Sequence, residues 1–574
     1  MGMDFKLPIL ERQRARGGDF RSKDTGGRGR EISILSLIFL GLLLVVFVRL
    51  FQVTVVQGAY YARLSEDNRI REMTIEARRG TITDRQGRPL AYNDDAELAS
   101  TSARLGSVRR YVDGLMMGHI IGYRQQADAQ DLDNDPCIGK LALGDKTGKK
   151  GVEKVFECEL RGRHGKKMVE YDAHGTAQET LAVTEPVAGQ DVRLAIDSGL
   201  QKAAYDAIAT TSAKLVAESK KPIRKSGIIA TDPNTGELLA FLSTPSFNPQ
   251  DFEDQTEEVS RLLKNPDQPL FSRVAEAAYP PGSIFKIIVA AGALEEKAVT
   301  PQTLIQDNGF IKAGPSIFHN WYYTEYGRTD GQVDVYKALQ RSNDIYFYKT
   351  GEKMGELAIK KWSERFGLGN KTSLPLEQTA GVLPSPFWKE ETLGEDWYLG
   401  DTYNYSIGQG YLLTSPLQIH QAETVISSMG AQICDPQLLA NPTPHCRRIK
   451  IAPTTVEVVK HGMKLACESG GTGWPLFNFA VKGHRIEVGC KTGTAEAHGN
   501  NDPEPHAWFT VFAPYESPAI HITVLIENGG QGSDAAAPIA KAMLEQYFTQ
   551  SDRYKQFPNV EPVATDAPII EIRE

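Results

Sequence analysis

The sequence predicts an α+β fold: an antiparallel sheet flanked by helices, on a β-rich pedestal, with one N-terminal transmembrane helix. Apolar runs at residues 228–230 and 238–241 flank the turn Asp232–Gly236, which indicates a hairpin. A second hairpin is indicated at residues 508–526, around a turn with two prolines. Helical patterns fill the chain between the hairpins, and this segregation is typical of α+β domains. An uncharged apolar run near the N-terminus indicates the membrane helix.

The membrane anchor is predicted at residues 32–53. The run from Ile32 to Val48 carries no charge, and as a helix it is just long enough to span a bilayer. Residues 1–31 are basic, so the positive-inside tendency predicts a cytoplasmic tail and an extracytoplasmic chain beyond the anchor. A cleaved signal peptide is the alternative. The length of the run and the lack of a nearby small-x-small cleavage site favour the anchor.

Residues 54–190 are predicted to form the pedestal. Strand-like segments lie on both sides of an Asp84–Gly87 turn, and the polar stretch that follows contains no obvious catalytic cluster. A spacer is therefore the expected role. At 574 residues the chain is too long for one ordinary domain, and its net charge of −8 gives no support for nucleic-acid binding.

Residues 191–550 are predicted to form the second domain. Val192, Leu194 and Ile196 alternate as in a strand, and residues 198–209 indicate a helix opened by an Asp/Ser cap. A helix at about 535–548 follows the second hairpin. The end of the chain, residues 551–574, is polar and proline-bearing, so we expect a loose tail.

Six cysteines lie beyond the anchor, on the oxidising side of the predicted membrane. An even number favours disulfides, although six cysteines allow fifteen pairings. Proximity in sequence favours Cys137 with Cys158 and Cys434 with Cys446, which leaves Cys467 with Cys490. A metal site at Cys434, His445 and Cys446 is the alternative, but no CxxC-type spacing supports it. We expect no metal and no cofactor.

The first candidate for chemistry is Ser283-Ile284-Phe285-Lys286. It follows Pro280-Pro281-Gly282 and precedes an apolar run at 287–291, which indicates a loop entering a buried helix. Positions three apart share a helix face, so Lys286 is expected to reach the hydroxyl of Ser283. A serine beside a lysine in a dry pocket is a nucleophile with its base. Two fixed positions alone can also occur by chance.

Two further motifs follow in order, Ser342-Asn343-Asp344 and Lys491-Thr492-Gly493-Thr494. Taken singly, the first could be a helix cap and the second a plain strand end. Together with Ser-x-x-Lys they form the signature of penicillin-binding proteins and serine β-lactamases. All three motifs in one domain of suitable size therefore indicate a catalytic site.

The chain resembles class B penicillin-binding proteins, and within them the elongation-type penicillin-binding protein 2. The stretches that carry the resemblance are RRGTITDRQGRPLAYN from Arg78, GVEKVFECELRGRHG from Gly151, DPNTGELLAFLSTPSFNP from Asp232, YPPGSIFK from Tyr279, WYLGDTYNYSIGQGYLLTSPLQI from Trp397 and KTGTAE from Lys491. The resemblance implies a penicillin-binding/transpeptidase fold in the bacterial inner membrane. It also implies a D,D-transpeptidase that cross-links peptidoglycan stem peptides through a serine acyl-enzyme, is acylated by β-lactam antibiotics and works with a SEDS-family membrane glycosyltransferase.

The resemblance also implies roles for the motif residues. Ser283 would attack the carbonyl between two D-alanines, and Lys286 must be neutral to take its proton. Burial and the nearby charge of Lys491 would lower the pKa of Lys286. Ser342 would relay a proton toward the leaving amine. Asp344 stands where the family usually has asparagine, which leaves open whether Asn343 or Asp344 contacts the substrate amide.

The remaining implied roles concern substrate binding. Lys491-Thr492-Gly493 is expected on an edge strand, where Gly493 lets a substrate backbone approach. Thr492 and Thr494 would hold the terminal carboxylate, and the backbone N–H groups of Ser283 and Thr494 would form an oxyanion hole. Ser406 and Gln409 are candidates for lining the cleft.

The match is weakest between Asn93 and Met117, where only about 25 residues occupy the place of a larger head subdomain. A shortened head puts the partner contacts of that region in doubt. Three other functions remain open: a division-type transpeptidase of the same class, a serine β-lactamase and a non-enzymatic β-lactam sensor. The anchor and pedestal argue against a lactamase, and the short cytoplasmic tail argues against a sensor.

Overall fold

The apolar N-terminal segment forms one long helix, α1 (Arg28–Phe51), which continues through a π-helical turn, η1 (Gln52–Val56). Residues Ile32–Val56 are long and apolar enough to cross a membrane, as predicted. The computed structural model describes residues 28–101, 104–172, 174, 176–496 and 504–559. The chain divides into two units, residues 1–73 with 167–183 and residues 74–166 with 184–574.

The first unit contains α1, η1, α2 (Gly58–Arg69) and a strand pair. Strand β7 (Gly165–Tyr171) hydrogen-bonds β8 (Ala177–Thr184), and β1 (Ile70–Ile75) borders this unit. Every residue of β8 is solvent-exposed. Strand β8 therefore buries no side chain, whereas Val169 of β7 is buried.

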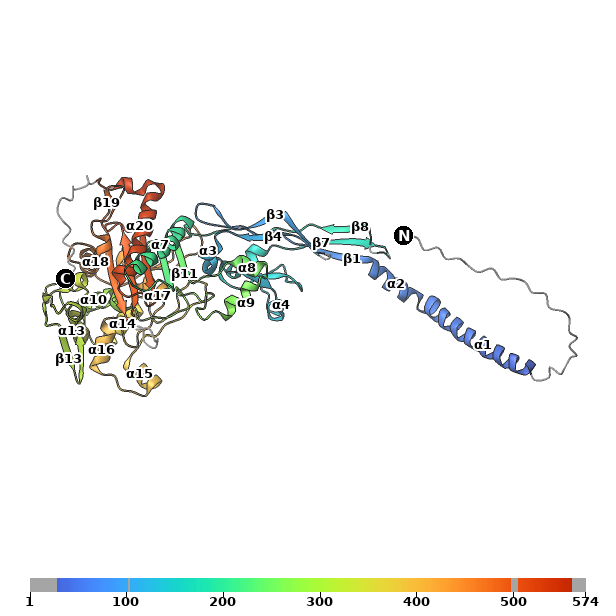
Figure 1. The fold of residues 1–574 in the computed structure, drawn as a ribbon, viewed down its shortest axis with the longest axis horizontal. Helices are drawn as coiled ribbons and strands as arrows, with labels where there is room; N and C mark the ends of the chain where they lie inside the picture. The colour runs from blue at the N-terminus through green and yellow to red at the C-terminus, as the bar shows by residue number, and fades with distance from the viewer. Residues whose placement is uncertain (1–27, 102–103, 173, 175, 497–503, 560–574) are drawn as a thin grey trace, which may run out of the picture. The chain divides into compact units, whose positions relative to one another are not determined.

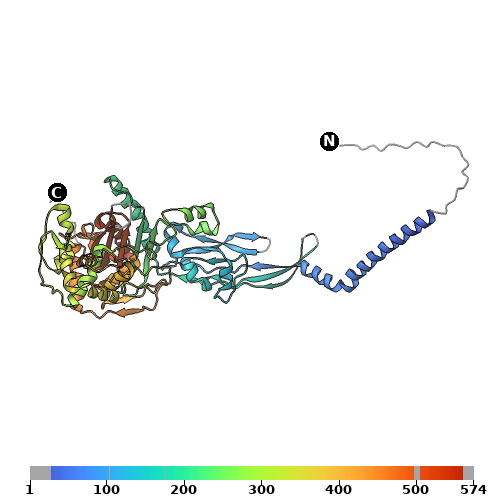
Figure 2. The same cartoon turned by 90° about the horizontal axis from the view of Figure 1, so that it is seen from below.

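The pedestal part of the second unit begins with the predicted turn at Asp84–Gly87. Strands β2 (Ile82–Thr83) and β3 (Pro89–Thr101) pair antiparallel around it, and Asp84 Oδ1 accepts from the backbone N–H groups of Gln86 and Arg88. β3 then pairs with β4 (Arg104–Tyr111), shown in light blue in Figure 1 and Figure 2. The described residues between Asn93 and Met117 therefore lie largely in two paired strands.

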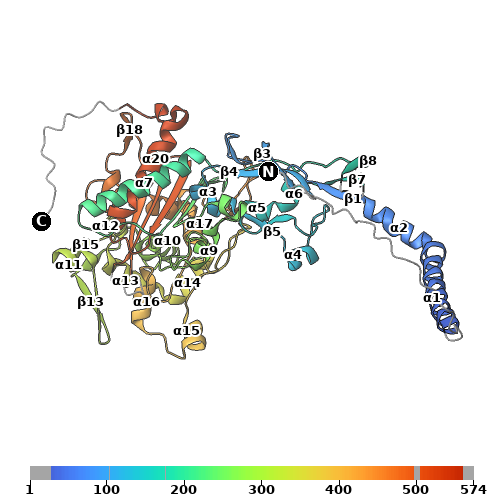
Figure 3. The same ribbon diagram turned by 45° about the vertical axis from the view of Figure 1, so that its right-hand side comes forward.

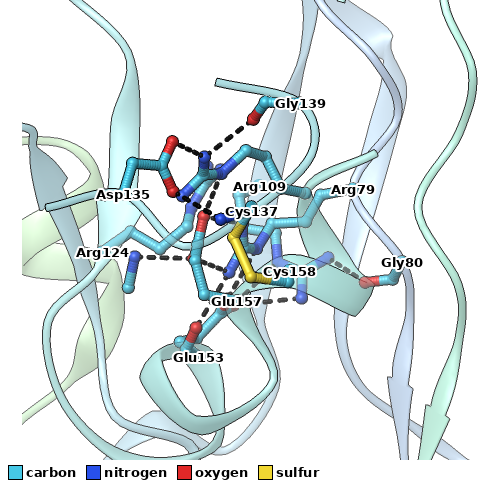
Figure 4. Close-up of polar contacts among 12 residues, drawn as sticks. Arg79, Gly80, Arg109, Arg124, Asp135, Cys137, Gly139, Glu153, Glu157 and Cys158 are labelled. Atoms are coloured by element: carbon cyan, nitrogen blue, oxygen red, sulfur yellow. Dashed lines mark hydrogen bonds and ion pairs between the residues drawn. A yellow bond between two sulfur atoms is a disulfide. The ribbon is translucent and has the colours of Figure 1, made fainter. Parts of the chain in front are cut away.

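A buried ion network holds the pedestal together (Figure 4). Arg79 pairs with Glu153 (2.7 Å) and Glu157 (2.5 Å), and Arg109 pairs with Glu153 at 3.0 Å. Burial alone would raise the pKa of Glu153, but Arg109, Arg79 and Arg124 outweigh burial and lower that pKa to about 2. The carboxylate of Glu153 is therefore an integral, charged part of this core.

The three disulfides expected from sequence proximity are confirmed. Cys137 bonds Cys158, Cys434 bonds Cys446 and Cys467 bonds Cys490. The bond between Cys434 and Cys446 takes both sulfurs away from the alternative metal site with His445. In the pedestal, the Cys137–Cys158 bond lies beside the ion network (Figure 4).

The centre of the second unit is a five-stranded antiparallel sheet of order β11-β10-β22-β21-β20. Both predicted hairpins are confirmed, and each provides two strands. The strand bounds are β10 (Ser226–Thr231), β11 (Leu238–Thr244), β20 (Gly489–Ala495), β21 (His506–Ala513) and β22 (Ile520–Ile526).

Helices cover both faces of this sheet (Figure 1 and Figure 3). Phe509 and Val511 of β21 pack in one core with α7 (Ser198–Ala217) and α20 (Ala537–Thr549). Trp508 and Phe512 alternate with them and pack in a second core. Among the helices that contribute to that second core are α10 (Lys286–Glu295), α12 (Val335–Arg341), α13 (Asp344–Met354), α17 (Pro416–Ser427) and α18 (Pro453–Ala466).

Two expectations about element lengths were wrong. The strand predicted at 192–196 is only β9 (Val192–Arg193), whereas the helix predicted at 198–209 extends to Ala217, with Asp197 as its N-cap. The C-terminal tail is not loose through residue 559, because Tyr554 is buried and the carbonyl of Phe557 hydrogen-bonds the His484 ring. Residues 560–574 of the predicted tail lie outside the described residues.

Further described helices of this unit are α3 (Gly114–Ile121), α4 (Ala129–Asp133), α5 (Gly151–Val155), α6 (Glu157–Arg161), α8 (Pro249–Glu253), α9 (Glu257–Lys264), α11 (Trp321–Tyr326), α14 (Glu356–Arg365), α15 (Pro386–Leu393), α16 (Leu399–Ser406), α19 (Gly532–Ala535) and the 3-10 turns η3 (Trp474–Leu476) and η4 (Gln550–Gln556). Short strand pairs are β5 (Arg124–Gln126) with β6 (Lys146–Gly148), β12 (Ile305–Asp307) with β15 (Gly331–Val333), β13 (Phe310–Ala313) with β14 (Ser316–His319), β16 (Gln432–Cys434) with β17 (Cys446–Arg448), and β18 (Ala480–Val481) with β19 (His484–Arg485).

Candidate active site

Ser283 lies on a 3-10 turn, η2 (Gly282–Phe285), which continues directly into α10. Gly282 has a φ of +59°, and a Cβ there would lie 2.8 Å from the carbonyl oxygen of Thr494. Glycine is therefore required for η2 to approach strand β20 this closely. This contact brings the Ser-x-x-Lys and Lys-Thr-Gly motifs together.

Lys286 is fully buried, and its ammonium group contacts the second motif. Its Nζ donates to Asp344 Oδ1 at 2.6 Å and to the carbonyl of Ser342 at 2.8 Å, and it lies 3.4 Å from Ser342 Oγ. The expected hydrogen bond from Lys286 to Ser283 does not form, and among the described residues the Ser283 hydroxyl has no hydrogen-bond partner. Burial lowers the pKa of Lys286, although the charge of Asp344 opposes this effect.

Ser342 lies between two helices and between two lysines. It ends α12 with a left-handed φ of +54°, and Asn343 then caps α13 by accepting from the N–H of Tyr346. Lys491 Nζ donates to Ser342 Oγ at 2.8 Å, so this hydroxyl contacts the lysines of both flanking motifs. One hydroxyl thus connects both buried lysines, which suits a proton relay.

Lys491 lies on β20, which is the edge strand of the sheet, as predicted. Burial lowers the pKa of Lys491 well below its usual value, and repulsion from Lys286 adds to the decrease. From the sequence, we expected repulsion between the two lysines to lower the pKa of Lys286. In the structure, this repulsion instead lowers the pKa of Lys491. Next along the strand, Thr492 Oγ1 donates to Thr472 Oγ1 at 2.7 Å.

The motifs meet at a cavity of about 1170 Å³. Six of the residues predicted from sequence line it: Ser283, Ser342, Asp344, Gln409, Thr492 and Thr494. Lys286 and Lys491 lie behind this lining, fully buried. Gln409 Nε2 donates to the carbonyl of Thr494 at 3.3 Å.

Three other predicted residues do not line the cavity. The prediction that Ser406 lines the cleft is wrong, because this residue is fully buried at the end of α16 and its hydroxyl donates to the carbonyl of Tyr403. Asn343 is also fully buried, and its amide N–H₂ donates to Asp307 and Asp330. Gly493 lies close to the neighbouring strand, where a Cβ would come within 2.9 Å of Trp508 Cβ.

Several residues of the site were not found from the sequence. Glu325, Gln531 and Thr472 line the cavity, and Gln531 connects Glu325 (2.5 Å) with the hydroxyl of Thr494 (3.3 Å). No motif marks Glu325 or Gln531. The glycines around Thr472 and its proximity to Cys467 are the one signal that could have indicated a tight loop there.

Comparison with known proteins gives two matching family models. The penicillin binding protein transpeptidase domain matches residues 226–545, and the penicillin-binding protein dimerisation domain matches residues 94–194. Peptidoglycan D,D-transpeptidase MrdA of Haemophilus influenzae is 31% identical over 528 residues, which cover 84% of this chain and 77% of that protein.

Solved structures of similar proteins agree with this match. Penicillin-binding protein 2 of Helicobacter pylori, in complex with MreC, has a TM-score of 0.70 and 26% identity and covers 84% of this chain and 99% of its own. A chain of a peptidoglycan synthase complex that coordinates polymerization and crosslinking has a TM-score of 0.71 and 27% identity and covers 91% and 98%. The three motifs around one cavity and these matches together show that the chain belongs to the penicillin-binding protein transpeptidase family, as a peptidoglycan D,D-transpeptidase of the penicillin-binding protein 2 type.

Proposed function

We propose that Ser283 is the nucleophile of this transpeptidase and that Lys286, Ser342 and Lys491 carry its protons. The observation that carries the proposal is the Ser342 hydroxyl, which contacts both buried lysines and borders the same cavity as Ser283. A nucleophile, a base with a lowered pKa and a connecting hydroxyl form the set that acyl transfer needs.

Acylation begins when Ser283 Oγ attacks the carbonyl carbon between two D-alanines of a donor stem peptide. Neutral Lys286 accepts the hydroxyl proton, and burial favours this neutral form. The C–N bond then breaks, and the amine of the terminal D-alanine leaves with a proton passed through Ser342. In the second half, the amine of an acceptor stem peptide attacks the ester carbonyl carbon, the C–O bond to Ser283 breaks, and the amine proton passes to Ser283 Oγ, which leaves the amide cross-link.

Substrate binding is assigned to the edge strand β20. An extended stem peptide can pair with its free edge, and Thr492, Thr494 and Gln409 border the cavity with groups that can bind the substrate carboxylate and amides. Backbone N–H groups of Ser283 and Thr494 would hold the oxyanion. β-Lactam antibiotics would acylate Ser283 by the same route.

Of Asn343 and Asp344, we infer that Asp344 is the residue that contacts the substrate amide. Asp344 borders the cavity, whereas the Asn343 amide is occupied by Asp307, Asp330 and the α13 backbone. The carboxylate of Asp344 also contacts Lys286, so it would couple substrate position to the state of the base.

We further infer that the chain acts in cell elongation with a SEDS-family membrane glycosyltransferase. A relative in a complex that coordinates polymerization and crosslinking supports this partnership. The basic residues before α1 support a cytoplasmic N-terminus, with the catalytic domain on the outer side of a bacterial inner membrane. The proposed domain bounds are a tail at residues 1–31, an anchor at 32–53 and a pedestal at 54–190. The transpeptidase domain follows at residues 191–550, and the C-terminal segment at 551–574.

Labelling with a fluorescent penicillin tests the proposal. Wild type and Ser406→Ala should label, because the Ser406 hydroxyl contacts only a backbone carbonyl among the described residues. Ser283→Ala should not label, and persistent labelling of that variant would show that another residue is acylated. The decay of the adduct separates the alternatives, since a transpeptidase adduct should persist for hours and a β-lactamase adduct should hydrolyse at once.

A further inference from the structure

Beside the Ser342–Asp344 motif lies a buried cluster of polar side chains that the reaction steps above do not use. Its members are Asp307 at the end of β12, Asn320 before α11, Asp330 before β15, and Asn343. Asp307 is 1% exposed, and Asn320 and Asn343 are 0% exposed. Such deeply buried polar groups need a full set of partners, so their hydrogen bonds define the local geometry.

Asp307 is the hub of this cluster. Its Oδ1 accepts from the N–H of Gly309 at 2.7 Å. Its Oδ2 accepts from three more donors, the side-chain amides of Asn320 (2.9 Å) and Asn343 (2.8 Å) and the N–H of Asp330 (2.9 Å). Four donors from four places in the chain therefore converge on one carboxylate, which is the arrangement a carboxylate can satisfy fully.

Asn320 connects the hub to Asp344. Its Oδ1 accepts from the N–H of Asp344 at 3.0 Å, and the next residue, Trp321, donates its own N–H to Asp344 Oδ2 at 2.9 Å. The backbone and one carboxylate oxygen of Asp344 are thus held by this short segment. The other oxygen, Oδ1, is the one that contacts Lys286.

Asn343 and Asp330 hold the motif from its other side. Asn343 Nδ2 donates to Asp330 Oδ2 at 2.9 Å as well as to Asp307, and Asp330 Oδ1 accepts from Arg341 Nε at 3.1 Å. The residues directly before and after Ser342 are therefore both tied to the cluster. Ser342 itself has a left-handed φ of +54°, which is uncommon for a residue with a side chain, and these contacts hold its two neighbours in place.

We propose that Asp307 and Asn320 are positioning residues for the transpeptidation reaction. Through them the cluster holds Asp344 against Lys286 and keeps the Ser342 hydroxyl between the two lysines. The inference rests on the proposed roles of Ser342 and Lys286. Its physical basis is that proton transfer tolerates little displacement of the groups involved.

Asn320→Asp tests the positioning role. The variant keeps the size of the side chain and the acceptor for the N–H of Asp344, but it sets a second carboxylate against Asp307. We expect the maximal rate of acylation by fluorescent penicillin to fall by roughly ten- to a hundredfold. The penicillin concentration at half-maximal rate should change little, because none of the four members of the cluster lines the cavity. Asp330→Asn, which weakens the contacts with Arg341 and Asn343, should lower the same rate less.

Asn234→Asp is the matched control. The Asn234 side chain also bonds backbone groups, the N–H of Met429 and the carbonyl of Pro518, but it does not border the cavity. After correction for the folded fraction from thermal melts, this control should acylate at the wild-type rate. If the folded Asn320→Asp and Asp330→Asn proteins also acylate at the wild-type maximal rate, the positioning role is wrong. If Asn320→Asp does not fold, the acylation rate of Asp330→Asn alone decides the question. Labelling of Ser283→Ala would instead overturn the proposed function.

Discussion

Replacing Cys467 and Cys490 together by alanine would remove the crosslink that joins the end of α18 to the catalytic edge strand. The two cysteines are 23 residues apart in sequence, and both are buried. Treating the disulfide as a restraint on the unfolded chain, a loop of this length contributes about 3 kcal/mol at 25 °C. We therefore expect the free energy of unfolding to fall by about 3 kcal/mol, measured by urea denaturation.

The same variant should also slow acylation by fluorescent penicillin. Cys490 directly precedes Lys491, and Thr472, five residues after Cys467, accepts the hydrogen bond of Thr492 in the cavity lining. Without the crosslink, the loop that carries Thr472 is less firmly held against β20.

The disulfide between Cys434 and Cys446 provides the control. It closes a shorter loop, with a separation of 12 residues, but because the stabilisation grows only with the logarithm of loop length its removal should also cost about 3 kcal/mol. Neither cysteine lines the cavity, and the acylation rate of the folded double-alanine variant should equal that of wild type. If removal of the Cys467–Cys490 bond leaves the acylation rate of the folded protein unchanged, or if the control slows it equally, the link to the site is refuted.

Three further predictions concern charge. Asp344→Asn removes the carboxylate that raises the pKa of Lys286, so the acidic limb of the acylation rate should move to lower pH in a pH–rate profile; a move to higher pH would contradict this. Glu153→Gln leaves the fully buried Arg109 without its ion-pair partner and should destabilise the protein by about 3–5 kcal/mol in urea denaturation. In wild type the stabilisation from Glu153 is present above the unfolded pKa of 4.5 and is lost as the pH falls toward 2. Burial raises the pKa of Glu423 to about 8, so wild-type stability should fall as the pH rises from about 4.5 through 8, and Glu423→Gln should flatten this fall in melting temperatures recorded across that range.

Local patterns predicted much of the catalytic domain. The hairpins at 228–241 and 508–526 were predictable because a turn between apolar runs is a short-range signal, and so were the helices that begin near Ser198 and end near Thr549. The end of the chain was not predictable, because Tyr554 and Phe557 are held by residues distant in sequence. Polarity near a terminus does not report such contacts.

The candidate active site was also predictable from the sequence only in part. The sequence by itself predicted the residues that we propose carry the chemistry, because Ser283, Lys286, Ser342 and Lys491 belong to motifs whose order and residue types restrict the possible reactions. Proximity in sequence favoured the three disulfide pairs, but six cysteines allow fifteen pairings and only the structure decided among them.

Only the tertiary structure decided which of these groups touch. Lys286 contacts Asp344 and Ser342 rather than Ser283, and Ser406 is buried away from the cavity. The hub at Asp307 carries no motif at all. The physical reason is that the direction of a buried side chain is set by packing and by hydrogen-bond partners from distant parts of the chain, which residue spacing does not encode.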